Sequence, residues 1–265
     1  MNTGANATAR RALVFALLAL AAAGAQAGRS CENRTPTVDA IQRSMTLAEH
    51  TARALDQSGA QVVVLARAGQ NLSEYHLRYS HLGFAYRDAD RHWRIVHKLN
   101  QCGSANGSLY RQGLGEFFLD DLYEYEAAVV IPTPEIQARL LPVLRDNARL
   151  AQLNTPSYSM VAYPWAQTYQ QSNQWALETF AMAQEPAAVS RERAQAWLKL
   201  QGYTPTTLHI GPLKRMGGRM TAANIAFDDH PNEKRFTDRI DTVTVDSVFA
   251  WLNRTGMAGS AIVIR

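Results

Sequence analysis

Two histidines, His81 and His97, lie in the stretch YSHLGFAYRDADRHWRIVHKLN, which runs from Tyr79 to Asn100. The alternation of apolar and polar residues predicts two strands joined by a polar loop, with one histidine on each strand. An imidazole can act as a general base when a second group holds its far ring nitrogen in one tautomer. The two histidines could therefore form a catalytic base and its orienting partner.

The expected strand pairing supports this interpretation. A symmetric loop would pair Ala85 with Trp93 and place His81 directly opposite His97, with Cβ atoms about 4.5–5.5 Å apart. Gly83, two residues after His81, would leave open space beside the ring. The alternative is that both histidines are ordinary residues of a half-exposed sheet.

A metal site is a further alternative for these histidines. Zinc takes three or four protein ligands, and the other candidates are distant in the sequence and have no motif spacing. These candidates are His209, Asp228, Asp229 and His230. We predict neither a metal nor a cofactor.

The order of three short motifs resembles the circularly permuted branch of the NlpC-type papain-like superfamily, which includes lecithin:retinol acyltransferase-like proteins. The motifs are Ser80-His81-Leu82-Gly83-Phe84, Ile95-Val96-His97 and Gln171-Ser172-Asn173-Gln174-Trp175. In that branch the catalytic histidine comes first, a second polar residue follows on the adjacent strand, and the nucleophile opens a later helix. The resemblance covers residues 61–183 and implies an amide or ester hydrolase or an acyltransferase. The whole chain is also similar to a family of exported bacterial proteins of unknown function.

This resemblance assigns His81 as general base, His97 as its orienter and Ser172 as nucleophile. The family uses cysteine, which the helix dipole and an imidazolium activate as thiolate; serine would instead need His81 to remove its proton during attack. Ser172 could equally be only the N-cap of its helix. A protein that binds without turnover is then the alternative function.

Aromatic residues flank the Ser172 region, and they could line a substrate groove or pack in the core. The substrate-binding candidates are Trp165, Tyr169 and Trp175. Cell-wall peptides or lipid acyl groups are the substrates expected from compartment and resemblance. We make no prediction of oligomeric state.

The N-terminus predicts export. Residues 1–27 combine Arg10 and Arg11, a short apolar run and an Ala25-Gln26-Ala27 cleavage site, the pattern of a secretory signal peptide. We therefore expect a periplasmic or secreted protein, with no transmembrane segment in the mature chain. In that compartment the only two cysteines, Cys31 and Cys102, are expected to form a disulfide.

The charge argues against nucleic acid as a partner. Removal of Arg10 and Arg11 lowers the formal net charge from +4 to +2, and the remaining basic residues are scattered. Residues 211–219 predict a basic glycine-rich loop, which could hold an anion or simply be mobile.

The elements expected around the candidate site predict an α+β fold with a small antiparallel sheet, flanking helices and a papain-like, permuted order. Strands are expected at 61–67 and 127–131 besides the two histidine strands, and helices at 46–56, 134–142 and 172–183. Residues 103–115 predict a loop. We assign residues 28–186 to the papain-like domain and 187–265 to a C-terminal α/β extension.

Overall fold

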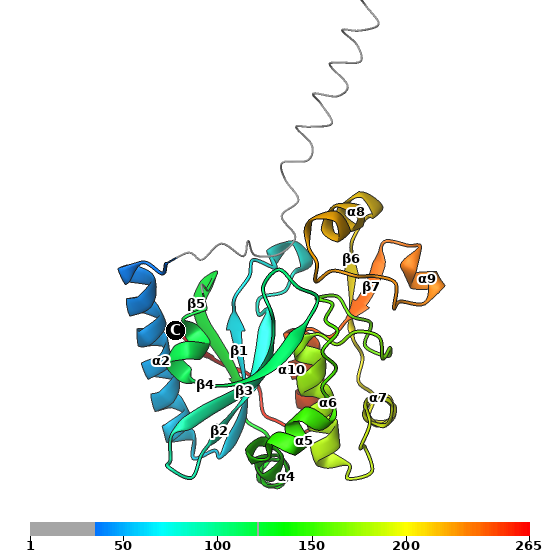
Figure 1. Cartoon of the computed structure of the whole chain (residues 1–265). Helices are drawn as coiled ribbons and strands as arrows, with labels where there is room; N and C mark the ends of the chain where they lie inside the picture. Colours follow the sequence, from blue (N-terminus) through cyan, green and yellow to red (C-terminus); the bar gives the residue numbers. More distant parts are fainter. Residues whose placement is uncertain (1–34, 121) are drawn as a thin grey trace, which may run out of the picture.

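The computed structural model describes residues 35–120 and 122–265 and has the expected α+β architecture (Figure 1). Its centre is a six-stranded antiparallel sheet with helices on both faces. The predicted signal peptide and Cys31 lie outside the described residues. No helix in the described ranges is long and apolar enough to cross a membrane.

The sheet brings together strands that are distant in the sequence. Its order is β4 (Gly107–Gly113), β3 (Trp93–Asn100), β2 (His81–Arg87), β1 (Val62–Ala68), β5 (Glu124–Val130) and β8 (Ile262–Ile264). Every residue of β1 is buried, which matches its β-branched sequence VVVLARA and its central place. The strands expected at 61–67, around His81 and His97, and at 127–131 are confirmed.

Two hydrophobic clusters cover the two faces of the sheet. One lies under α2 (Val38–Ser58) and α3 (Leu114–Phe118) and contains Phe117 and Phe118. The other lies under α4 (Pro134–Arg145), α6 (Ser172–Gln184) and α10 (Val245–Arg254) and contains Phe84 and Trp175. Side chains alternate along each strand, so neighbouring residues of β2 belong to different clusters. We call these faces the α3 face and the α6 face.

The C-terminal residues contribute to the same body. Helix α7 (Arg191–Leu200) packs beside α6, α10 adds Trp251 to the cluster on the α6 face, and β8 pairs with β5. A second, two-stranded sheet of β6 (Thr206–His209) and β7 (Arg239–Thr242) carries a small cluster of its own. The remaining short elements are η2 (Ser73–Tyr75), α5 (Asn147–Gln152), α8 (Pro212–Thr221) and α9 (Asn232–Arg235).

Three expectations about elements are wrong. Helix α2 begins at Val38, not Thr46, because the Thr37 hydroxyl caps it by accepting a hydrogen bond from Ala40 N at 3.1 Å. Residues 107–113 form the edge strand β4, whose polar and partly exposed side chains hide the strand pattern. Residues 212–221 form helix α8 because Arg215 packs inward over Phe227 and overrides two poorly helix-forming glycines.

Candidate functional site

The rings of His81 and His97 form a direct hydrogen bond, with 2.8 Å between His81 Nε2 and His97 Nδ1. The predicted register is wrong by two residues, since Ala85 pairs with Ile95 and not with Trp93. His97 consequently lies beside Gly83, where an added Cβ would be only 2.9 Å from His97 Cβ. The absence of a side chain at Gly83 lets the two imidazoles meet diagonally across the strands.

Gln112 on β4 extends the histidine pair into a chain of three side chains. His97 Nε2 lies 2.8 Å from Gln112 Oε1, which is a carbonyl oxygen and only accepts. A neutral His97 therefore carries its proton on Nε2 and accepts at Nδ1, so His81 Nε2–H is the donor to His97. This arrangement fixes the tautomer of His81 and leaves Nδ1 as the nitrogen that can take up a further proton.

His97 is suited to orienting and not to proton transfer. It has no exposed surface, and burial, together with the nearby charge of Arg67, lowers its pKa to about 3. It is therefore neutral at physiological pH. Arg67 is itself buried, with its guanidinium 4.6 Å above the Phe117 ring, and it donates to Phe117 O and to Asp120.

Phe117 forms the wall against which both imidazoles lie. Its ring centroid is 6.0 Å from that of His81 and 5.2 Å from that of His97. The histidine pair therefore belongs to the α3 face of the sheet, and His81 is only 8% exposed.

Ser172 begins α6 as predicted, but it is not the cap. Gln171 is the N-cap, because its Oε1 accepts from Asn173 N at 3.0 Å. The Ser172 hydroxyl instead lies 3.2 Å from the hydroxyl of Tyr158, and both side chains are buried. The interpretation of Ser172 as a simple N-cap is therefore wrong.

A side-chain bond links the serine-bearing helix to the histidine-bearing strand. Asn173 Oδ1 accepts from Leu82 N at 3.0 Å, so α6 begins beside the start of β2. Ser172 and His81 lie on different sides of this end of the sheet. Helix α6 packs on the α6 face, whereas the histidine rings lie on the α3 face. The structure thus brings His81 and His97 into contact and places Ser172 at the same end of the sheet, bonded to Tyr158.

The three aromatic candidates have different environments. Trp175 has no exposed surface and donates from Nε1 to Leu150 O at 3.3 Å, so it packs in the core. Trp165 is half-buried, and its ring centroid lies 6.0 Å from that of Tyr203. Lys199 Nζ lies 4.8 Å from the centroid of the Trp165 ring.

Tyr169 is half-buried, and its hydroxyl lies 3.3 Å from both carboxylate oxygens of Asp228. Trp165 and Tyr169 are thus the aromatic candidates that keep surface for a ligand.

Sequence reasoning missed a buried charged network beside Ser172. Lys98 has no exposed surface, and its Nζ donates to Thr155 O at 2.5 Å and to Gln170 Oε1 at 2.8 Å. Burial lowers the pKa of Lys98 to about 7. The detectable signal was a lysine on the same strand face as apolar Val96.

The same network continues through a buried ion pair. Gln170 Nε2 donates to Glu178 Oε2 at 2.6 Å, and Arg191 Nε donates to that oxygen at 2.8 Å. Arg191 also binds the carbonyl oxygens of Ala166 and Tyr169, which fixes the loop before α6.

The remaining candidates have partners within the protein. His230 Nδ1 lies 2.9 Å from Asp229 Oδ1, and its Nε2 lies 3.0 Å from Asp241 O. Within the described ranges, no three histidine, cysteine or acidic residues gather as a metal-binding group. Cys102 is not a free cysteine; because Cys31 lies outside the described residues, the Cys31–Cys102 pairing stays a prediction.

Comparison with known proteins places the chain in one family. A family model described as an uncharacterized protein conserved in bacteria (DUF2145) matches residues 54–252. This range includes both histidines, Gln112 and Ser172. No curated protein and no solved structure matches the chain.

Proposed function

The chain belongs to this uncharacterised bacterial family, and we propose that it is an exported hydrolase or acyltransferase that acts on an amide or ester. The observation that carries the proposal is the hydrogen-bonded chain from His81 through His97 to Gln112. A buried, neutral imidazole that holds a second imidazole in one tautomer is an arrangement that suits a general base.

In the proposed reaction, His81 Nδ1 takes the hydroxyl proton of Ser172 as Oγ attacks the carbonyl carbon of the substrate. The proton then passes from His81 to the leaving amine or alcohol, and the acyl group stays on Ser172. Water releases it in a hydrolase, and an acceptor hydroxyl or amine releases it in an acyltransferase. Ser172 and His81 lie on different sides of this end of the sheet, so the Ser172 hydroxyl must first leave Tyr158 and reach His81 around that end.

Two local features support Ser172 in this role. Gln171 already caps the helix, so Ser172 is free of that structural task. Asn173, the next residue, is bonded to the main chain of the strand that begins with His81. The resemblance to the permuted papain-like branch adds that a nucleophile is expected at this position.

The substrate class follows from the expected compartment. Residues 1–27 have the pattern of a signal peptide, so we propose periplasmic or secreted action on a cell-wall peptide or a lipid acyl group. Trp165 and Tyr169 are the proposed substrate contacts.

The direct test is labelling of the purified mature protein with a fluorophosphonate probe, which reacts with activated serine. We expect labelling of the wild type, none for Ser172→Ala, and a large loss for His81→Ala. His209→Ala is the matched control, because His209 is an exposed histidine paired with Asp238 at 2.9 Å. Labelling that survives in Ser172→Ala would exclude Ser172 as nucleophile.

A second experiment measures whether His81 acts on position 172. In Ser172→Cys, the thiolate absorbance is titrated with and without His81→Ala. Proximity to an imidazolium lowers a thiol pKa, so the double variant should have the higher thiol pKa. Equal thiol pKa values would show that the two positions do not interact.

A non-catalytic binding protein is the second candidate function. It is favoured by the contact between Ser172 and Tyr158 and by the burial of both hydroxyls. It predicts that Ser172→Ala retains the phenotype of the wild type in a cell-envelope assay, whereas Trp165→Ala does not.

A further inference from the structure

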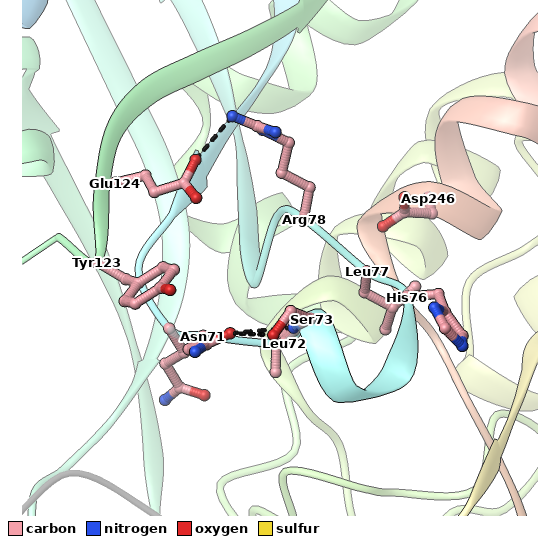
Figure 2. Close-up of a pocket in the computed structure, with 10 residues that line it drawn as sticks. Asn71, Leu72, Ser73, His76, Leu77, Arg78, Tyr123, Glu124 and Asp246 are labelled. Atoms are coloured by element: carbon pink, nitrogen blue, oxygen red, sulfur yellow. Dashed lines mark hydrogen bonds and ion pairs between the residues drawn. The ribbon is translucent and has the colours of Figure 1, made fainter.

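A polar cavity of about 230 Å³ lies at the end of the sheet where β1 finishes and β5 begins (Figure 2). Its walls come from the loop between β1 and β2, from the start of β5 and from the start of α10. The lining residues used below are Leu72, His76, Leu77, Arg78, Glu124 and Asp246.

The positive charge in this wall is already neutralised. Arg78 Nη2 donates to Glu124 Oε2 at 2.7 Å and to Glu126 Oε2 at 2.8 Å. Glu126 also accepts from Arg265 Nε at 2.7 Å, so these two carboxylates neutralise two guanidinium groups and Arg78 is already paired. Among the lining residues, Glu124 balances Arg78, and Asp246 adds one further carboxylate.

Asp246 has one carboxylate oxygen that lacks a hydrogen-bond partner among the described residues. Its Oδ2 is buried and accepts no hydrogen bond from the described residues. Figure 2 shows its carboxylate on the α10 side of the cavity, directed into the space between Leu77 and Arg78. A buried carboxylate oxygen without a hydrogen bond is unfavourable.

Helix capping does not account for Asp246. The Thr244 hydroxyl accepts from Ser247 N at 3.1 Å, and the Ser247 hydroxyl lies 3.1 Å from Thr244 N as its acceptor. These two residues form the complete capping box of α10. The capping box therefore leaves Asp246 Oδ2 as the oxygen that is available to a ligand.

We propose that this cavity binds a small molecule or peptide end through a protonated primary amine, which donates a hydrogen bond to Asp246 Oδ2. An ammonium group supplies only donors, which is what an acceptor-only carboxylate needs. Leu72 and Leu77 give the carbon next to the amine an apolar contact. This site is separate from the histidine pair and does not depend on the proposed catalysis.

The interaction depends on pH in a defined direction. The groups that face Asp246 across the cavity are His76, Arg78, Tyr123 and Glu124. Burial raises the pKa of Asp246 above its usual value. The ammonium pairs with the ionised form, so its affinity should rise as the pH increases through that pKa.

The test is calorimetric titration of the mature protein with alanyl-alanine amide and with its N-acetylated form, which lacks the charge. A second matched pair, glucosamine and N-acetylglucosamine, separates a peptide source from an amino-sugar source of the same group. We expect the free amine of at least one pair to bind at least about tenfold more tightly than its acetylated form, in line with a charge-assisted hydrogen bond.

Asp246→Asn should remove this preference. Glu135→Gln is the matched control, because Glu135 is exposed and occupies the corresponding second position of α4. If Asp246→Asn does not fold, the pH dependence of the wild type decides the question. Three outcomes would each overturn the proposal. They are equal binding of the free amine and its N-acetylated form, no binding of either free amine, and an affinity for the amine that does not fall below the pKa of Asp246.

Discussion

His81 and His97 are bonded through Nε2 and Nδ1 at 2.8 Å although they are not opposite one another in the sheet. Gly83 makes the contact possible, because a Cβ there would lie 2.9 Å from His97 Cβ and 3.0 Å from Val96 O. The glycine of the first motif is thus part of the histidine pair, and it provides space that the imidazoles use.

Gly83→Ala should destabilise the protein and separate the two rings. The added methyl group has no room, and overpacking of this kind costs about 1–3 kcal/mol. Urea unfolding measures the loss, and the histidine ring ¹⁵N resonances report the broken bond. Gly259→Ala is the control, since no atom lies within 4 Å of its Cβ position; equal losses for both variants would contradict the packing argument.

His97 should make the fold less stable in acid. Its pKa in the folded protein is about 3, against 6.5 as the reference value, so only the unfolded chain gains a proton between those values. Stability from this group is complete above pH 6.5 and falls as the pH decreases toward 3. The wild type loses free energy of unfolding at about 1.4 kcal/mol per pH unit over this range. Between pH 6.5 and 4, the free energy of unfolding of His97→Asn should therefore fall by ~3 kcal/mol less than that of the wild type. The free energy of unfolding is measured with urea at each pH for both proteins. The same pH dependence in the wild type and in His97→Asn would refute the prediction.

Lys98 should give a second pH window, at alkaline pH and with the same sign. Burial lowers its pKa from 10.5 to about 7, so the unfolded chain binds the extra proton between pH 7 and 10.5. The wild type should therefore become more stable as pH rises through this range, by at most about 1.4 kcal/mol per unit. Lys98→Met should lack this rise, whereas Lys199→Met, which changes an exposed lysine, should keep it. Chemical denaturation from pH 7 to 10 makes the comparison.

The ion pair of Arg191 and Glu178 should be a main determinant of the stability of the loop before α6. Their side chains are 7% and 1% exposed, and Nε lies 2.8 Å from Oε2. Arg191→Met leaves a buried carboxylate without its cation, which costs about 3–5 kcal/mol. Arg193→Met, on the exposed side of the same helix, should change stability little. A small effect of Arg191→Met in thermal unfolding would show that the network is not needed.

Much of the sheet could be predicted from local pattern. The runs around Val62, Leu82, Ile95 and Val129 are apolar or alternating, so each strand was recognisable from a few residues. Strand β4 was missed because an edge strand with polar side chains has no such pattern. Helix α8 was missed because packing of Arg215 outweighs the low helix propensity of its glycines.

The candidate site was predictable in part for a related reason. Alternation correctly placed His81 and His97 on one face, and a register error of two residues preserves that face. The contribution of Gln112 was not predictable, and the strand pattern could indicate the burial of Lys98 but not its partners, because those are brought together by the fold. Short motifs indicated which residues could react. They gave no information on the face of the sheet on which Ser172 lies relative to the histidine pair.

The pairing of β5 with β8 has a consequence for the order in which the protein forms. Ala127 pairs with Ile264, so the outer neighbour of β5 is supplied by residues synthesised long after it. Until those residues are available, β5 presents an unpaired edge, and closing so large a loop is slow compared with forming local contacts. A newly made chain therefore keeps an unpaired edge at β5 until its last residues have been synthesised.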